Sequence, residues 1–444
     1  MKKRLVLSGV LLFTILIILG TRAFDALAVS SGQEDSAYDN LAILTRALQL
    51  IRQDYVDDKK VGYRELTYAA MRGMLQSLDP HSQFMEPKDF KGMQEETDSQ
   101  FGGLGVVVSM RDGNITIISP MEDTPGFKAG LLPGDRIVKV NGTSTEKMQL
   151  SDVIQSLRGK PGDKVTLTIL RPSTKEVKDF TMERAVIKVE SVKDAKILPV
   201  DQAGDFKIGY VRITQFNKPT ADELAKKLNE LEGQGMQALI LDLRYNPGGL
   251  LESAVKVCGE FLPANQMVVY TEGRVPSQKK IYRTPENTKQ RPKYPVAILV
   301  NGSSASASEI VAGALKDLNR AILVGETTFG KGSVQSVIQM PDGSALRLTT
   351  ARYFTPGKQV IHEKGVSPNI LVSISQDQEK LLLLKRREEL LSDTEKKEVA
   401  NFHDLQLDRA VDALKGVMIY TKKTSPSAGE KKAAGEADGT AVVQ

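Results

Sequence analysis

Histidine, cysteine and tryptophan are scarce in this chain of 444 residues, which contains three histidines, one cysteine and no tryptophan. The single cysteine, Cys258, excludes a disulfide within the chain, and we interpret it as a small buried apolar residue. No group of cysteine, histidine and carboxylate residues has the spacing of metal ligands, so we expect no metal site and no cofactor. With so few histidines, a nucleophile in this chain needs a base of another kind.

Neither the charge nor the aromatic content indicates a nucleic-acid partner. The 60 basic and 55 acidic residues are mixed along the chain and leave a net charge of only +5. Aromatic residues make up 5% of the chain, which offers few platforms for base stacking. We therefore expect no nucleic acid to bind. The length predicts roughly two to four globular units.

The first 28 residues are typical of an export signal. Three basic residues at positions 2–4 precede an apolar run from 5 to 19, and residues 26–28 offer a small-x-small cleavage site. The run is long for a signal peptide and short for a membrane span of ~20 residues, so a cleaved signal and a membrane anchor both remain open. In either case we expect the remaining chain in the periplasm or on the outer face of the cytoplasmic membrane.

The hydrophobic pattern predicts an α/β protein with a second, β-rich domain and helical segments at both ends. Apolar residues at three- and four-residue steps indicate helices, alternation indicates strands, and buried strands alternating with helices indicate a largely parallel sheet. A final stretch rich in Ala, Gly, Ser and Lys predicts disorder. The predicted boundaries are 36–98 for the N-terminal helical segment, 99–185 for the β-rich domain, 186–375 for the α/β core, 376–420 for the C-terminal helical segment and 421–444 for the tail.

A serine-rich segment, 303–309, lies between an apolar strand and a helix. Ser306 and Glu309 form a capping-box pattern, and helix capping alone explains such a serine. The helix start also offers unpaired N–H groups and a partial positive charge, and the N–H of Ala307 is the first candidate to stabilise an oxyanion. Ser306 is therefore our candidate nucleophile.

Lys331, between two glycines, is the candidate general base. Its pKa would have to fall from ~10.4 to about 7, a shift that desolvation of a buried lysine can supply when no carboxylate is near. No acidic residue occurs between positions 327 and 340. Gln335 could orient the amine without raising its pKa as an acid would, although this contact needs the backbone to bend at Gly332. A surface lysine and an edge-strand glutamine are the simpler alternatives.

Two glycine-containing segments could bind backbone atoms of a ligand. In the segment 242–249, Gly248 and Gly249 let N–H groups approach closely and could supply a second oxyanion donor. In the β-rich domain, the loop of Gly102, Gly103, Leu104 and Gly105 could hold a terminal carboxylate. The following strand and the helix from about residue 150 would form a groove for an added peptide strand.

Five segments, taken in order, resemble the carboxyl-terminal processing proteases, family S41 of the serine peptidases. The resemblance implies Ser306 as nucleophile, Lys331 as base and Gln335 as its orienting partner, with oxyanion donors from Ala307 and from Gly248 or Gly249. It also implies a crotonase-like core and a PDZ domain. One departure is Pro368-Asn369, where the family often has Pro-Asp, which puts a local turn in doubt. The matching segments are 78–82, 101–105, 242–249, 304–309 and 325–332.

The expected function is that of an exported serine endopeptidase that captures proteins by an apolar C-terminal tail and cuts them near the C-terminus. Its partners would be protein substrates, with an adaptor or a second copy of the chain as further candidates. There are three other interpretations. One is a catalytically inactive secreted adaptor. Another is a penicillin-binding type enzyme using Ser277 and Lys280, but this Ser-x-x-Lys pattern lies in a polar, basic loop and we interpret it as chance. The third is a nucleotide-binding protein, because 325–331 nearly matches a phosphate loop, although Gly332 replaces the Ser or Thr that magnesium requires.

Overall fold

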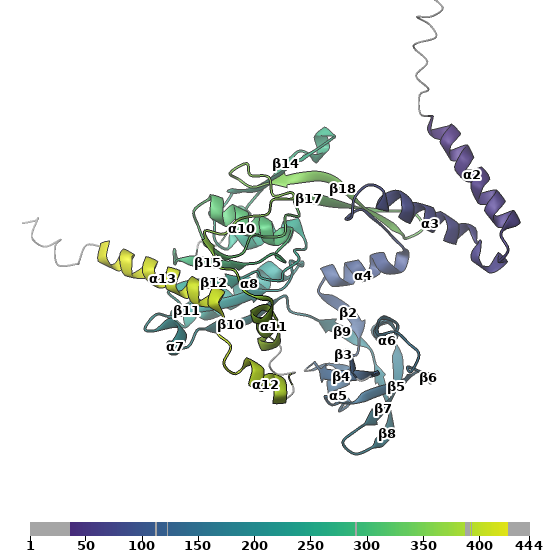
Figure 1. Ribbon diagram of the computed structural model, residues 1–444, viewed down its shortest axis with the longest axis horizontal. Helices are drawn as coiled ribbons and strands as arrows, with labels where there is room; N and C mark the ends of the chain where they lie inside the picture. Colours follow the sequence, from purple (N-terminus) through teal and green to yellow (C-terminus); the bar gives the residue numbers. More distant parts are fainter. Residues whose placement is uncertain are drawn as a thin grey trace, which may run out of the picture. The chain divides into compact units, whose positions relative to one another are not determined.

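The computed structural model describes residues 36–111, 113–121, 123–288, 291–386, 391 and 393–424 (Figure 1). The contacts divide the chain into two compact units, residues 1–84 and 85–444. The predicted export signal and most of the predicted tail lie outside the described residues. Within the described ranges, no helix combines the length and the apolar character that a membrane crossing needs.

The first unit is helical, as the three- and four-residue spacing of its apolar residues predicts. It contains α2 (Ala37–Asp54), the short 3-10 helix η1 (Asp58–Lys60) and α3 (Tyr63–Gln76). Helix α3 buries Tyr68, whose ring lies 4.8 Å from that of Phe84, centroid to centroid. Helix α2 buries none of its residues.

The β-rich domain of the second unit is a six-stranded sheet entered and left through one pair of strands. After β1 (Gln83–Met85) and α4 (Pro87–Thr97), strand β2 (Gln100–Gly103) pairs antiparallel with β9 (Ala185–Lys188). The sheet order is β3-β4-β5-β7-β8, and β6 pairs with β5, so β3 is an edge strand. The elements between β2 and β9 are β3 (Val106–Arg111), β4 (Asn114–Pro120), α5 (Pro125–Lys128), β5 (Arg136–Val140), β6 (Thr143–Ser144), α6 (Leu150–Leu157), β7 (Lys164–Arg171) and β8 (Glu176–Glu183).

The α/β core is built on a second six-stranded sheet with the order β10-β11-β12-β15-β16-β19. All neighbours are parallel except β10 and β11. Its strands are near-continuous apolar runs because helices cover both faces. Helices α8, α9 and α10 pack on one face and α13, yellow in Figure 1, on the other. The elements are β10 (Val192–Ile197), α7 (Val200–Ala203), β11 (Ile208–Ile213), α8 (Thr220–Gly233), β12 (Ala238–Asp242), α9 (Leu251–Gly259), β15 (Val296–Val300), α10 (Ala307–Asp317), β16 (Ile322–Gly325) and β19 (Ile370–Leu371).

A smaller antiparallel sheet stands beside this core. In it β18 (Ala345–Phe354) pairs with both β13 (Met267–Gly273) and β17 (Ser333–Gln339), and β13 also pairs with β14 (Lys280–Arg283). The 3-10 helix η2 (Pro276–Gln278) joins β13 to β14. Because β17 follows the glycine–lysine loop as a strand, the structure lacks the helix that a phosphate loop requires at this point.

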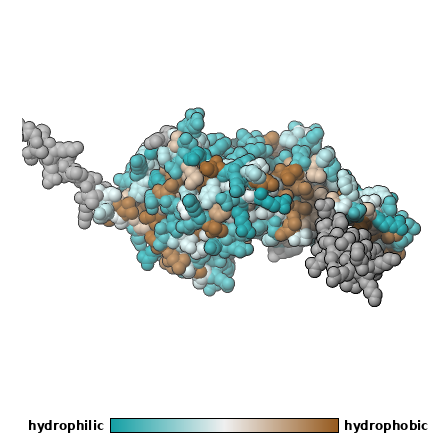
Figure 2. All heavy atoms as spheres, turned by 90° about the horizontal axis from the view of Figure 1, so that it is seen from above, coloured by the Kyte–Doolittle hydropathy of each residue, from teal (hydrophilic) through white to brown (hydrophobic). Residues whose placement is uncertain are grey.

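The C-terminal part is helical, with α11 (Gln376–Lys385), α12 (Asp393–Val399) and α13 (Leu405–Thr424). The mixed α/β fold with helical segments at both ends is therefore confirmed. At the departure from the family pattern, Oδ1 of Asn369 accepts the N–H of Leu323 at 2.9 Å and so supplies β16 with the acceptor that an aspartate would. Figure 2 shows a face on which hydrophilic and hydrophobic side chains are interspersed.

Candidate active site

Ser306 lies in a sharp turn between β15 and α10. Its backbone has φ 57° and ψ −113°, a conformation that costs free energy for a residue with a side chain and that often marks a functional site. Neighbouring serines hold the turn: Ser304 donates to the carbonyl of Leu243 at 2.8 Å, and Ser308 donates to that of Asn246 at 2.9 Å. Ser306 itself is half-buried.

The fully buried carboxylate of Glu309 joins the serine turn to the lysine loop. Its Oε2 accepts the backbone N–H of Ser306 at 2.8 Å and that of Lys331 at 2.9 Å, so those nitrogens lie no farther apart than the two distances together. Its Oε1 accepts the hydroxyl of Thr328 and the N–H of Gly330, both at 2.6 Å. Burial raises the pKa of Glu309, while these hydrogen bonds oppose the rise. The two segments that the sequence singled out are thus side by side.

Tyr353, on β18, provides a second link between them. Its hydroxyl donates to the backbone carbonyl of Lys331 and shares a hydrogen bond with the side chain of Ser306. The side chain is only 2% exposed, and burial raises its pKa well above the ordinary value. This burial favours the protonated phenol, which can donate a hydrogen bond.

In the side-chain amide of Gln335, the nitrogen has hydrogen-bond partners and the oxygen has none among the described residues. Its Nε2 donates to Ser333 at 3.1 Å and to Thr349 at 2.8 Å. Its Oε1 is buried without a partner among the residues that the structure describes, so the predicted contact with Lys331 is not formed here. The pairing of β17 with β18 shifts register between Val334 and Gln335, where Thr350 of β18 is left unpaired. An unpaired buried acceptor costs about 1–3 kcal/mol, which favours a donor entering this position.

The turn 245–249, which we call the oxyanion turn, packs directly against Ser306. Gly248 has φ +102°, and a Cβ added to it would lie 2.7 Å from Cβ of Ser306 and 2.9 Å from N of Ala307. Its own N–H already donates to Oδ1 of Asn246 at 2.9 Å. In the described part of the chain, the N–H groups of Ala307 and Gly249 have no acceptor. This leaves Ala307 and Gly249 as the freer of the three candidate donors.

The glycine loop of the β-rich domain is only partly as expected. Gly102 and Gly103 belong to β2 and pair with Val186 and Ala185, and the carbonyl of Gly102 accepts the N–H of Gly159 at 3.0 Å. The side chain of Leu104 is buried in the domain core, and Gly105 has φ +68°. The edge strand β3 lies beside α6, which is the arrangement that a strand-adding groove needs.

Sequence reasoning missed three residues of this site. Glu309 was noticed only as half of a capping box, and nothing in the local pattern marked Tyr353. Arg244 was read as part of a turn, yet its side chain is 1% exposed and pairs with Asp242. A charged residue between an apolar strand and a glycine pair was the one signal that could have identified it.

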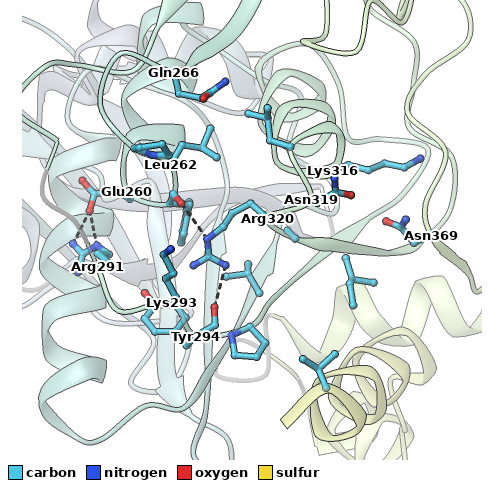
Figure 3. Close-up of a pocket in the computed structure, with 18 of the residues that line it drawn as sticks. Glu260, Leu262, Gln266, Arg291, Lys293, Tyr294, Lys316, Asn319, Arg320 and Asn369 are labelled. Carbon is cyan, nitrogen blue, oxygen red and sulfur yellow. Dashed lines mark hydrogen bonds and ion pairs between the residues drawn. The ribbon is translucent and has the colours of Figure 1, made fainter. Parts of the chain in front are cut away.

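A cavity of about 800 Å³ lies at the other end of the parallel strands (Figure 3). It adjoins the starts of β15 and β16, whereas Ser306 and Lys331 follow their ends. Its arginines are already engaged: Arg291 pairs with Glu260, and Arg320 donates to two backbone carbonyls. The cavity is therefore separate from the candidate active site.

Comparison with known proteins identifies two domain families in the chain. Residues 207–372 match peptidase family S41 and residues 116–171 match the PDZ domain. The carboxy-terminal processing protease CtpB of Bacillus subtilis is 37% identical over 353 residues, 79% of this chain and 71% of the relative. The carboxy-terminal-processing protease of Bartonella bacilliformis is 38% identical over 373 residues, 82% of this chain and 81% of the relative.

Two solved structures also resemble parts of the chain. The photosystem II D1 C-terminal processing protease is 30% identical, with 74% of this chain and 92% of that chain covered and a TM-score of 0.41. The PDZ domain of the carboxy-terminal protease from Vibrio cholerae, solved with a peptide, is 29% identical, covering 20% of this chain and 99% of that one, with a TM-score of 0.19.

The matched domains define a serine peptidase that carries a PDZ domain. More narrowly, the chain belongs to peptidase family S41, among relatives that are named carboxy-terminal processing proteases.

Proposed function

We propose that Ser306 is the nucleophile of this peptidase and that Lys331 is its general base. The observation that carries the proposal is the Glu309 carboxylate, which binds the backbone N–H of both residues through one oxygen. If Glu309 only capped helix α10, it would not need to bind the loop that contains Lys331. The strained backbone and the partial exposure of Ser306 also support a reactive serine.

In the proposed acylation, Oγ of Ser306 attacks the carbonyl carbon of the scissile peptide bond and passes its proton to the neutral amine of Lys331. The oxyanion that forms accepts hydrogen bonds from the N–H of Ala307 and from the oxyanion turn, where Gly249 is freer than Gly248. The lysine ammonium then gives its proton to the leaving amine, the C–N bond breaks, and an ester on Ser306 remains.

In the proposed deacylation, a water molecule attacks this ester while Lys331 takes the proton of the water. The ester bond breaks and the lysine returns the proton to Oγ of Ser306, so the enzyme is regenerated and one peptide bond has been hydrolysed. Gln335 would accept a hydrogen bond from the amine through its open Oε1 and aim it at Ser306. No cofactor takes part in either step.

Substrate capture is the second part of the proposal. We propose that the PDZ domain binds proteins by an apolar C-terminal tail, which adds as a strand along β3 with its carboxylate near residues 102–105. The catalytic pair then cuts the chain near that end. The open edge of β3 beside α6 supports this mode of binding.

A third part concerns location and assembly. We propose that the protein is exported and acts in the periplasm or on the outer face of the cytoplasmic membrane, with residues 1–28 as a cleaved signal or an anchor. An adaptor or a second copy of the chain remains a candidate partner, and the exposed Leu41 and Ile51 of α2 support such a contact. Alkaline phosphatase fused after residue 35 should be active in cells, since that enzyme matures only outside the cytoplasm, and an inactive fusion would contradict export.

The catalytic proposal can be tested with Ser306→Ala, Lys331→Ala and Lys331→Arg, assayed on an envelope-protein extract with mass-spectrometric mapping of new C-termini. All three variants should fold and leave the extract uncut, the arginine variant because a guanidinium does not deprotonate. Ser277→Ala is the matched control and should cut normally. Cleavage retained by Ser306→Ala would end the assignment.

A further inference from the structure

A buried ionic network ties the oxyanion turn to the C-terminal helices. Arg244, at the start of the turn, is 1% exposed and pairs on one side with Asp242, its near neighbour in sequence, at 2.8 Å. On the other side its two terminal nitrogens bind both oxygens of Asp404, at 2.9 and 2.8 Å, and one of them also binds Oε1 of Gln406 at 3.0 Å. A guanidinium fork that meets a carboxylate with two parallel hydrogen bonds fixes direction as well as distance.

A second set of contacts also joins the α/β core to the C-terminal segment. Arg386 donates to Oδ2 of Asp242 at 2.8 Å and lies with its guanidinium carbon 5.0 Å from the ring centre of Tyr245. The hydroxyl of Tyr245 in turn donates to Glu379, on α11, at 2.9 Å. Tyr245 has φ +62°, so the surroundings must hold its backbone in an unfavourable conformation.

The network reaches the nucleophile through one more residue. Asn246 follows Tyr245, and its carbonyl accepts both the N–H of Ala305 at 3.0 Å and the hydroxyl of Ser308 at 2.9 Å. Its Oδ1 accepts the N–H of Gly248 at 2.9 Å. A shift of Arg244 and Tyr245 would therefore move the oxyanion turn relative to Ser306.

Among the ion-paired residues of this network, the core and the C-terminal segment each contribute one anion and one cation. These are Asp242 and Arg244 in the core, and Asp404 and Arg386 in the C-terminal segment. Removal of a single member leaves an uncompensated buried charge, whereas removal of one opposite pair leaves a neutral pair behind. The C-terminal segment thus matches the core in charge without being needed to neutralise it, which suggests a role in geometry.

We propose that Asp404 is a positioning residue for catalysis, which holds the oxyanion turn against Ser306 through Arg244. This inference rests on the proposed function, because it assumes that the turn stabilises an oxyanion formed at Ser306. It assigns the C-terminal segment a part in the chemistry that its charged and helical sequence did not indicate. A misplaced oxyanion donor lowers transition-state stabilisation while substrate binding is unchanged.

The test must separate this role from helix capping, because Oδ1 of Asp404 also accepts the N–H of Leu407 at the start of α13. Asp404→Asn suits this purpose, since asparagine caps helices as well as aspartate but cannot bind a guanidinium through two anionic oxygens. Gln406→Met is a second variant that removes one hydrogen bond to Arg244, and with it the bond from Nε2 to the carbonyl of Val372 at 2.8 Å, at nearly constant volume. Asp412→Asn, the same change in an exposed pair on the same helix, is the matched control.

Each purified full-length variant is assayed for kcat and KM on a protein substrate, for the rate at which a small fluorophosphonate labels Ser306, and for its melting temperature. For Asp404→Asn we expect kcat and the labelling rate to fall together by about 10-fold or more, with KM within about twofold, and Gln406→Met to fall less. Asp412→Asn should match wild type. An unchanged kcat, or a lower melting temperature with an unchanged labelling rate, overturns the inference.

The same experiment distinguishes a failure of the proposed function from a failure of the positioning role of Asp404. If wild type is not labelled at Ser306, or if Ser306→Ala still cuts the substrate, the proposed function itself fails. If wild type is labelled and cuts through Ser306 but both C-terminal variants keep the wild-type kcat, the proposed function stands and only the positioning role of Asp404 is rejected. Should Asp404→Asn fail to fold, Gln406→Met alone decides between these outcomes.

Discussion

One oxygen of Glu309 accepts the backbone N–H of Lys331 at 2.9 Å, across a separation of 22 residues in sequence. The carboxylate thus binds the lysine through its main chain, where it fixes the position of the residue. A glutamate placed instead against the amine would favour the ammonium form and oppose a basic role. The buried acid Glu309 therefore holds the candidate base in place through hydrogen bonds to backbone amides, without facing its amine.

Replacement of Glu309 by Gln should reduce activity far more than it disturbs the fold. The amide that replaces one oxygen is a donor and cannot accept the N–H groups that now reach it, so one pair of donors loses its partner at a cost of about 1–3 kcal/mol. We expect kcat to fall by about 100-fold and the melting temperature to drop by a few degrees. Glu363→Gln, an exposed site near the lysine loop, is the control for steady-state kinetics and thermal melts and should change neither value.

Removal of the Tyr353 hydroxyl should affect catalysis through the positions of Ser306 and Lys331. Tyr353→Phe deletes the hydrogen bonds to both residues and keeps the buried ring. We expect kcat to fall about 10-fold with little change in KM, since the loss is about one hydrogen bond of positioning. Tyr294→Phe, which removes a hydroxyl bonded to Glu232 far from the site, should behave as wild type. A Tyr353→Phe enzyme with normal kcat would show that the hydroxyl plays no part.

A carboxylate in place of the Gln335 amide should shift the pH dependence of the reaction. In Gln335→Glu the new anion would face Lys331 and favour its charged form, so deprotonation would require a higher pH. The acidic limb of the kcat/KM profile should move upward by about one pH unit or more. Gln339→Glu, at the exposed far end of the same strand, is the control. An acidic limb that stays in place would mean that the side chain at position 335 does not contact the base.

Features that depend on residues close together in sequence could be predicted, whereas contacts between distant residues could not. Local periodicity predicted the helices and strands, because apolar spacing of 3.6 or 2 residues reflects burial on one face. The strand–helix junction singled out Ser306, and the scarcity of histidine together with the flanking glycines singled out Lys331 as a candidate base, whereas their pairing came from the resemblance to family S41. Metal-like or histidine-based chemistry was set aside on composition alone.

Long-range side-chain contacts could not be predicted in this way. Tyr353 meets Lys331 only because β18 folds back on β17, and Asp404 meets Arg244 from 160 residues away. No local pattern encodes such distances, and a charged C-terminal helix looks the same whether it is solvated or docked. The register shift beside Gln335 could not be predicted either, because the sequence period does not encode it.

Acid should weaken the contribution of the buried network to stability. Burial opposes ionisation of Asp242, but Arg244 and Arg386 outweigh it, so the pKa of this carboxyl lies well below its ordinary value. The unfolded chain therefore binds the proton first, and the stabilisation, complete above the ordinary pKa of ~3.9, is lost as the pH falls below it. Urea unfolding of wild type and Asp242→Asn between pH 7 and 3 should show a stability difference that narrows only at the acidic end. A difference independent of pH would contradict the ionised assignment, and Asp412→Asn should show no such trend.

The space in front of the Ala307 N–H provides the sharpest test of the oxyanion turn. A Cβ at Gly248 would lie 2.7 Å from the carbonyl oxygen of Ala305 and 2.9 Å from N of Ala307, in a backbone conformation of φ +102° that a side chain disfavours. In Gly248→Ala we expect the turn to move away from Ser306 and kcat to fall by about 100-fold or more. Gly302→Ala is the matched control, because it adds the same methyl group to the same strand–helix connection where no atom lies within 4 Å, and its kcat should stay normal. If both alanine variants cut substrate at the wild-type rate, the turn at Gly248 does not form part of the catalytic surface, and the oxyanion must be stabilised from elsewhere.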